Sequence, residues 1–142
     1  MSGIEPLSAA SRIAASGLEA QSLRLRVVAE NIANAQTTGT VAGANPYARK
    51  TVSFANVLDE QSGITKVEVD RVGRDAAAFP LEFQPGHPAA DARGYVKMPN
   101  VNMMVEMADM REATRSYEAN LQVIRQSRDM GTMLVDLLRG GS

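Results

Sequence analysis

Apolar residues in the first quarter of the chain recur with steps of three and four. From Pro6 to about Ala35 the sequence has no internal proline and a single glycine, so one uninterrupted helix is predicted there. The recurring positions form a heptad seam: Leu7, Ser11, Ala14, Leu18, Gln21, Leu25, Val28 and Ile32. A second apolar set lies about half a turn away: Ile13, Ala20, Leu23 and Val27. Two apolar stripes indicate a helix that is covered on more than one side.

The pattern returns in the last third of the chain, after a proline and a cap-capable asparagine, Pro99 and Asn100, that mark a helix start. This second helix is predicted from about Val101 to Leu138, with Gly140 and Gly141 ending it. Its seam is Met103, Met107, Met110, Ala113, Tyr117, Asn120, Ile124, Ser127, Gly131, Leu134 and Leu138, and its second apolar flank is Val123, Met130, Met133 and Leu137. A sustained seam with about 3.5 residues per repeat predicts a left-handed supercoil with a neighbouring helix.

The middle of the chain has a different texture. A loop containing Gly39, Gly43 and Asn45-Pro46 leads into segments that read as short strands: Tyr47–Phe54, Ile64–Val72, Phe79–Phe83 and, after a rigid turn at Pro85-Gly86-His87-Pro88, Tyr95-Val96. The predicted fold class is therefore α+β, with long N- and C-terminal helices packed as a coiled coil and a small β-rich module between them. The predicted domains are residues 1–36 plus 100–142, a discontinuous helical domain, and residues 37–99, the linker and β-module.

The seams contain small or polar residues such as Ser11, Ala14 and Gly131 where a stable dimeric coiled coil prefers leucine or isoleucine. Close approach of helices is therefore favoured over stability of an isolated pair. Two interpretations remain open at this point: helices that join an assembly, or an ordinary helical hairpin packed on a sheet in a monomer.

Charge and composition exclude several classes of protein. The 15 lysines and arginines balance 16 acidic residues, so there is no footprint for nucleic acid. A membrane-surface module would need a basic polar face, but arginine and glutamate alternate along both helices. No run approaches the roughly 18 apolar residues of a membrane span, and the N-terminus lacks the pattern of a secretory signal peptide. Without cysteine there are no disulfides or thiolate sites.

Residues for catalysis are sparse. His87 is the only histidine and lies between Gly86 and Pro88, so a structural turn is favoured over an active site. Asp91 and the Asp59-Glu60 pair are interpreted as solvated loop carboxylates. No nucleotide-binding spacing occurs. The sequence therefore predicts a protein that is not an enzyme and has no cofactor, metal or small-molecule substrate, with an enzyme built on His87 as the weakest alternative.

The end of the first helix, residues 31–39 (NIANAQTTG), resembles a signature shared by flagellar axial proteins of rod and hook. The residues that carry it here are Asn31, Asn34, Thr38 and Gly39. Asparagine and threonine can bond nearby backbone groups while the glycine permits the turn, so the helix would leave its bundle at a defined angle. The segment departs from the common pattern at Glu30 and Thr40.

A stronger resemblance lies in residues 85–101 (PGHPAADARGYVKMPNV), followed by Glu106-Met107 and residues 115–120 (RSYEAN). These segments resemble the FlgC family of proximal rod proteins, through Pro85, Gly86, His87, Pro88, Gly94, Tyr95, Pro99 and Asn100. Gln84 and Ala89 stand where that family commonly has acidic residues. The resemblance covers nearly the whole chain.

The resemblance implies a structural subunit of the proximal rod of the flagellar basal body, exported through the type III apparatus without a cleaved signal peptide and placed in the periplasm-spanning rod. The helices would form the inner layer of a tubular drive shaft that transmits torque and encloses the export channel. The implied partners are copies of itself, other proximal rod proteins, the distal rod protein and the MS ring. Another axial subunit of a flagellar or type III secretion assembly is the alternative. The predicted assembly seam is Leu7, Ala14, Leu18, Leu25, Val28, Ile32, Tyr117, Asn120, Ile124, Gly131, Leu134 and Leu138.

Overall fold

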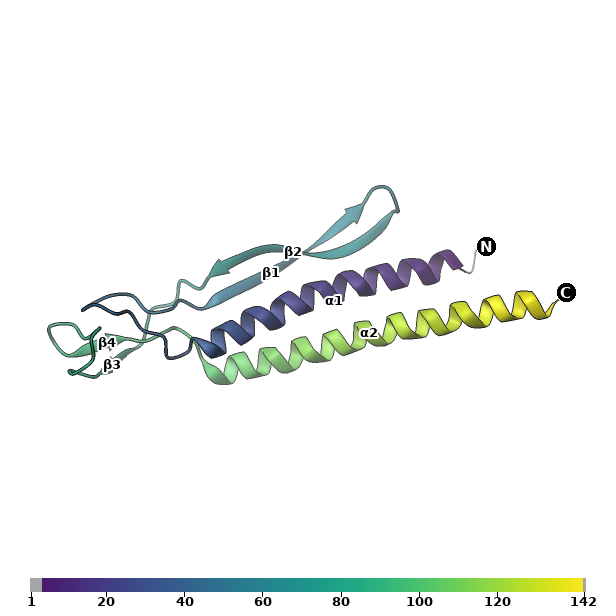
Figure 1. Ribbon diagram of the computed structural model, residues 1–142. Helices are drawn as coiled ribbons and strands as arrows, with labels where there is room; N and C mark the ends of the chain where they lie inside the picture. The colour runs from purple at the N-terminus through teal and green to yellow at the C-terminus, as the bar shows by residue number, and fades with distance from the viewer. Residues whose placement is uncertain (1–3, 142) are drawn as a thin grey trace. The chain divides into compact units, whose positions relative to one another are not determined.

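The fold is α+β, with two helices that pack together and two small sheets in the sequence between them (Figure 1). The computed structural model describes residues 4–141. Its elements are α1 (Ile4–Ala33), β1 (Lys50–Asp59), β2 (Ile64–Arg74), β3 (Leu81–Phe83), β4 (Tyr95–Lys97) and α2 (Met103–Gly140).

The described chain divides into two compact units, each with part of both helices. The first unit contains the chain up to Arg24, Ser53–Asp70 and the chain from Glu112 onward, and the second contains Leu25–Val52 and Arg71–Arg111. The domains predicted from the sequence divide the chain by type of element instead, and that division stays a prediction. Its outermost residues, 1–3 and 142, lie outside the described residues.

Both predicted helices are confirmed, with ends within about two residues of expectation. The start of α2 differs in its cause: Asn102, not Asn100, is the cap. The Oδ1 atom of Asn102 accepts hydrogen bonds from the backbone N–H groups of Met104 and Val105 at 3.0 and 3.3 Å. Asn100 instead accepts a hydrogen bond from the backbone N–H of Arg49 at 2.7 Å. Its amide tethers a loop rather than starting the helix.

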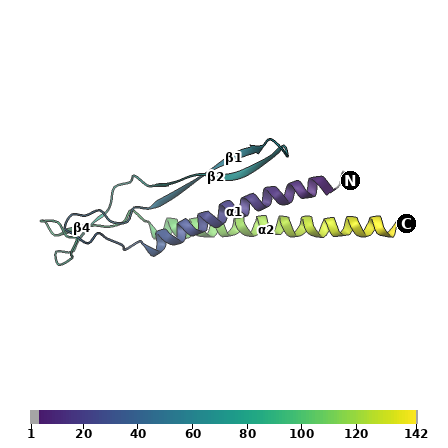
Figure 2. The ribbon, with the colours of Figure 1, turned by 45° about the horizontal axis from the view of Figure 1, so that its top comes forward.

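The helices run in opposite directions and lie side by side in both views (Figures 1 and 2). In the first unit the buried helix residues are small: Ala14, Gly17, Ala20, Ala113 and Ser127. Small side chains let helix axes approach closely, and close approach is what the small seam residues of the sequence predict. The hydroxyl of Ser16 also accepts a hydrogen bond from the backbone N–H of Val67, at 3.2 Å, and so joins β2 to α1.

The strands form two separate two-stranded sheets. β1 and β2 are a hairpin closed by a turn in which Gly63 adopts φ 68° and donates to the carbonyl of Asp59 at 2.7 Å. β1 begins three residues later than predicted and runs on to Asp59. β3 and β4 are antiparallel, with Leu81 opposite Lys97 and Phe83 opposite Tyr95. The Phe83 and Tyr95 rings meet edge to face with centroids 5.3 Å apart.

The core of the second unit contains both apolar and polar side chains. Its buried apolar side chains include Val27, Val28, Ala89 and Val96. Asn31 and Glu106 are buried beside them with 1% and 0% of their surface exposed. Every buried side-chain nitrogen and oxygen in the described part of the chain has a hydrogen-bond partner, so these polar groups are accommodated rather than stranded.

Candidate assembly surface

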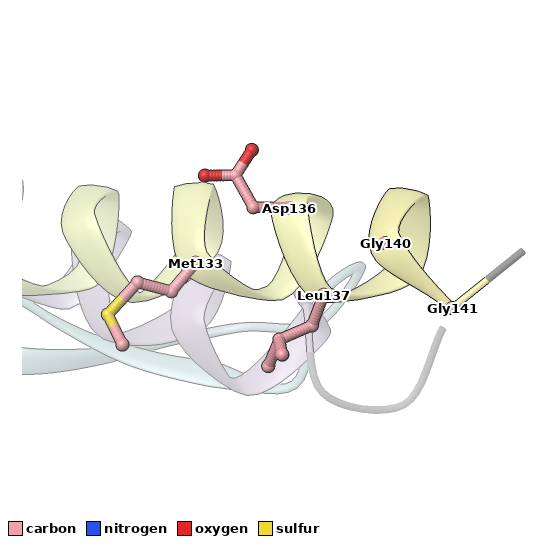
Figure 3. A pocket seen from close by; sticks show the side chains of 5 residues that line it. All are labelled: Met133, Asp136, Leu137, Gly140 and Gly141. Carbon is pink, nitrogen blue, oxygen red and sulfur yellow. The ribbon is translucent and has the colours of Figure 1, made fainter.

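Large apolar side chains lie exposed along the C-terminal half of α2. We define the exposed flank as the four residues that the sequence assigns to the second apolar set of this helix, Val123, Met130, Met133 and Leu137. All four are exposed, Met133 to 63% and Leu137 to 71%. Met133 and Leu137 project to one side of α2 and Asp136 to the other (Figure 3). A row of this kind marks a surface made for contact with another molecule.

The exposed flank continues into an apolar groove at the open end of the helix pair. The groove is lined by Pro6, Leu7, Met130, Met133, Leu134 and Leu137. Its walls come from both α1 and α2 within the first unit, and its lining is almost wholly apolar. A side chain that entered it would therefore contact the exposed flank and the predicted seam residues Leu7 and Leu134 together.

The predicted seam residues differ in how far they are buried. Ala14 and Val28 are buried, and the other predicted seam residues except one are half-buried: Leu7, Leu18, Leu25, Ile32, Tyr117, Asn120, Ile124, Gly131 and Leu134. The exception is Leu138, which is 74% exposed. At the start of α2 the buried position is Glu106, whereas Met103 and Met107 are exposed. In the first turn of α2 the buried position is therefore Glu106, one residue before Met107, which the sequence predicts on the seam.

Side-chain hydrogen bonds close the exit from α1. Asn34 donates through Nδ2 to the carbonyl of Glu30 at 2.9 Å, and Thr37 donates through Oγ1 to the Oδ1 atom of Asn34 at 3.1 Å. Gly39 was expected to permit the turn, but it is not among the glycines with positive φ. A Cβ there would lie 2.5 Å from the Cβ of Ala44, so this glycine is required for space instead.

The return turn before β4 is organised by His87 and Asp91. The Nδ1 atom of His87 accepts the N–H of Ala89 at 3.0 Å, and its Nε2 lies 3.4 Å from the Oγ1 of Thr38. Because Nδ1 is an acceptor, the proton of a neutral ring is on Nε2, facing Thr38. This contact joins the two segments that carry the flagellar resemblance.

Asp91 is a turn residue rather than a merely solvated carboxylate. Its Oδ1 accepts the N–H groups of Tyr95 and Arg93 at 3.0 and 2.9 Å. The hydrogen bond from the backbone N–H of Tyr95 is the largest influence on the pKa of the Asp91 carboxyl group and lowers it. Desolvation opposes this shift, but the backbone N–H and the positive charge of Arg93 add to the lowering. Gly94 completes the turn with φ 86°, and the space that its Cβ would occupy is filled by Phe83 and Pro85.

A polar cluster joins the end of α1, the start of β1 and the start of α2 in the second unit. Arg49 donates through Nε to the Oε1 of buried Glu106 and through Nη1 to the Oδ2 of Asp75 at 3.4 Å. Desolvation would lower the pKa of Arg49, but the hydrogen bond and charge of Glu106, with a contribution from Asp75, raise it above the ordinary value. The guanidinium group of Arg49 therefore carries a positive charge beside the buried Glu106 carboxylate.

Reasoning from the sequence missed this cluster. In the sequence Glu106 stands out only as part of the resemblance, and Tyr47, Arg49 and Lys50 only as members of the predicted strand Tyr47–Phe54. One signal was present: stepping back by four from Met110 reaches Glu106, on the same helix face as Ala113 and Tyr117. An acidic residue at such a position predicts a buried partner, but the partner's identity depends on a fold that brings residue 49 to residue 106.

Residues 4–141 contain no group of three or more histidines, cysteines or carboxylates placed to hold a metal ion. Neither described helix combines the length and apolar character that crossing a bilayer requires. An antiparallel helix pair with an exposed apolar flank, and with hydrogen-bonded turns where the chain leaves α1 and returns toward α2, is the architecture of an assembly protein.

Two family models match the chain at its two helical ends. The model described as "Flagella basal body rod protein" matches residues 12–39, and "Flagellar basal body rod FlgEFG protein C-terminal" matches residues 92–137. These ranges contain the helix exit, the end of the return turn and most of α2.

Curated relatives agree over nearly the whole chain. A flagellar basal-body rod protein FlgC of Agrobacterium fabrum is 61% identical over 136 residues, covering 96% of this chain and 98% of the relative. Those of Borreliella burgdorferi and Bacillus subtilis are 37% and 39% identical and cover 90% and 83% of this chain. The chain belongs to the FlgC family of flagellar basal-body rod proteins and is a structural subunit of the rod.

Proposed function

We propose that this subunit builds the proximal segment of the rod by packing its helices against those of neighbouring subunits. In this arrangement α1 and α2 form the inner, coiled-coil layer of a tubular drive shaft, which transmits torque and encloses the export channel. Residues 1–36 and 100–142 would form that helical layer, and residues 37–99 the linker and β-module. The subunit would act through surfaces, without catalysis, cofactor or substrate.

The observation that carries this proposal is the exposed flank of α2. Met130, Met133 and Leu137 expose most of their apolar surface in the single chain. Burying a side chain of this kind stabilises a complex by roughly 1.5 to 3 kcal/mol. Several such residues along one helix, repeated in every subunit, supply a driving force for side-by-side packing.

The proposed neighbours are copies of this chain, other proximal rod proteins, the distal rod protein and the MS ring. The name shared by the relatives supports a location in the basal body. The periplasm-spanning position in the rod, and export through the flagellar type III apparatus without a cleaved signal peptide, belong to the same proposal. The predicted seam residues, from Leu7 to Ile32 on α1 and from Tyr117 to Leu138 on α2, would hold the helices in register within and between subunits.

The sharpest test places a charge on the exposed flank. Met133→Glu and Leu137→Glu change residues that the single chain leaves largely exposed, so each variant should fold and be synthesised normally. Charge at the half-buried Leu18 or Ile124 would disturb folding and assembly together and is less informative. In a strain lacking the native gene, we expect the flank variants to leave cells non-motile, with basal bodies that show membrane rings but no rod.

Thr132→Glu is the matched control because it adds the same charge to the adjacent exposed residue on the polar side of α2. It should restore motility. Far-UV circular dichroism of the purified proteins verifies that all three variants retain their helices. Complete hooks and filaments in cells with folded Met133→Glu or Leu137→Glu protein would contradict the proposal.

A further inference from the structure

Glu106 is the largest fully buried side chain in the described part of the chain. A buried carboxylate is costly unless it is paired and hydrogen-bonded, and apolar side chains of similar volume usually pack a helix at least as well. Its position in the first turn of α2 would be filled more simply by a leucine or methionine. Its hydrogen bonds, rather than its packing, therefore distinguish Glu106 at this position.

The two oxygens of Glu106 bind two different segments of the chain. Oε1 accepts the Nε–H of Arg49, the residue before β1, and Oε2 accepts the Nδ2–H of Asn31 near the end of α1 at 3.4 Å. Arg49 is held from a second side, because its backbone N–H donates to Asn100. Asn100 in turn donates through Nδ2 to the carbonyl of Asp75, just past β2, at 3.1 Å.

The side-chain amide of Asn31 pairs with both backbone polar groups of Lys50, the first residue of β1. Its Nδ2 donates to the Lys50 carbonyl at 2.9 Å, and its Oδ1 accepts the Lys50 N–H at 2.8 Å. Oδ1 also accepts the hydroxyl of Tyr47 at 2.8 Å. The amide thus takes the place of a neighbouring strand at the point where β1 begins.

This pairing works in one orientation of the amide only. Rotating it by half a turn would set its oxygen against the Lys50 carbonyl and the Glu106 carboxylate, so that acceptors would face acceptors. The Lys50 backbone and the Glu106 carboxylate both select the observed orientation. Of the two groups that fix the amide, the Lys50 backbone belongs to β1 and the Glu106 carboxylate to α2.

We propose that Glu106 is a positioning residue, which acts through Asn31 and Arg49 to hold the start of β1 against the ends of both helices. Two of the three contributing segments belong to α1 and α2 and the third is the start of β1, so these contacts couple the position of β1 to the helix pairing. In a rod built as proposed above, every copy must present β1 from the same place. The consequence for assembly rests on that proposed function, but the positioning itself does not.

The test exchanges the carboxylate and the amide. Asn31→Asp alone sets two carboxylates side by side, and Glu106→Gln alone sets its N–H₂ against the donor of either Arg49 or Asn31. Amide hydrogen exchange at Lys50 in the full-length protein should speed up about tenfold in each single variant, the effect of losing one ordinary hydrogen bond. In the double variant Asn31→Asp/Glu106→Gln, the new carboxylate again faces an amide donor. Exchange should there be at least about threefold slower than in Asn31→Asp alone, a coupling of the size found for contacting residues.

Glu112→Gln is the matched control, since this α2 carboxylate is 71% exposed and makes a surface ion pair with Arg24 at 3.3 Å. Its effect on exchange at Lys50 should be negligible. A double variant that exchanges as fast as or faster than Asn31→Asp, or single variants that exchange like the native protein, would overturn the positioning role.

Motility of the same strains tests the consequence for assembly separately. We expect Glu106→Gln to reduce motility and Glu112→Gln to leave it intact. Native motility in a Glu106→Gln strain whose purified protein shows fast exchange at Lys50 would overturn the coupling of β1 position to assembly. If Met133→Glu were also fully motile, the proposed helix-packing function itself would fail, so the two failures have different signatures.

Discussion

A Cβ atom at Gly17 of α1 would lie 2.7 Å from the Nδ2 of Asn120 on α2. The amide of Asn120 occupies that space and donates to the carbonyl of Ser116 at 2.9 Å. Gly17 therefore marks a point of close helix approach in the first unit. A Cβ atom at Gly131, on the predicted seam of α2, would meet no atom within 4 Å beyond its own stretch of helix. Each glycine lowers helix stability through the same low helix propensity, but only Gly17 is surrounded by side-chain atoms of the other helix.

We predict that Gly17→Val destabilises the protein by about 2 kcal/mol, because the new side chain displaces the Asn120 amide from a packed contact. Gly131→Ala should instead stabilise the chain in dilute solution by up to about 1 kcal/mol, through helix propensity alone. Chemical denaturation followed by circular dichroism measures both. Asn120→Ala should reduce the cost of Gly17→Val, and a cost independent of residue 120 would contradict the contact.

The turn glycines allow a second comparison. Gly94 and Gly43 both have positive φ, 86° and 74°, but a Cβ on Gly94 would lie 2.8 Å from Cε2 of Phe83, whereas the one on Gly43 meets nothing within 4 Å. Gly43→Ala should cost about 1 to 2 kcal/mol for the left-handed backbone alone. Gly94→Ala should cost a further 1 to 3 kcal/mol, roughly, for overpacking. Equal unfolding free energies for the two variants would refute the difference.

His87 is expected to act as a turn residue. His87→Ala leaves the N–H of Ala89 without its acceptor and should cost about 1 kcal/mol. His87→Asn can place an oxygen near the site of Nδ1 and should retain most of that stability. Both variants should support motility. A non-motile His87→Asn strain with a normally stable protein would favour the catalytic alternative.

The β1–β2 turn should respond to acid. The side-chain hydrogen bond from Lys66, then those from Ser62 and the backbone of Gln61, lower the pKa of Asp59 from 3.8 to about 2. Because the folded pKa lies below the unfolded value, the stabilisation is fully present above pH 4, approximately, and is lost as the pH falls toward 2. An NMR titration of Asp59 and the Gln61 amide should show a shared transition in that window. Asp59→Asn should remove the transition from the Gln61 amide, and a midpoint near 3.8 in the native protein would exclude the proposed bonds.

The sequence alone was sufficient for the helices and most strands, because their signals are local. Steps of three and four, the absence of proline and the terminal glycines are properties of neighbouring residues, so both helices were predicted to within a few residues. The second apolar flank of α2 was predicted in the same way, because the periodicity of Met130, Met133 and Leu137 is visible in the sequence, whereas its exposure in the single chain comes from the structure. The family resemblance was carried by short, contiguous segments.

The errors occurred where a residue's role depends on a distant one. Asn100 was predicted to start the helix, but its side chain accepts a hydrogen bond from the backbone N–H of Arg49. Asn102 caps α2 instead. Gly39 was predicted to permit the turn through its backbone, but a glycine is required there because a Cβ atom would collide with the side chain of Ala44.

The apolar stripes and the approximate extents of both helices were determined by the sequence itself, because a periodic pattern acts within one element. The burial of Glu106, its bonds to Asn31 and Arg49, and the contact of Gly17 with Asn120 were decided only by the tertiary structure. The physical reason is that burial, and the partner that makes a buried charge tolerable, arise from residues brought together by packing rather than by position along the chain.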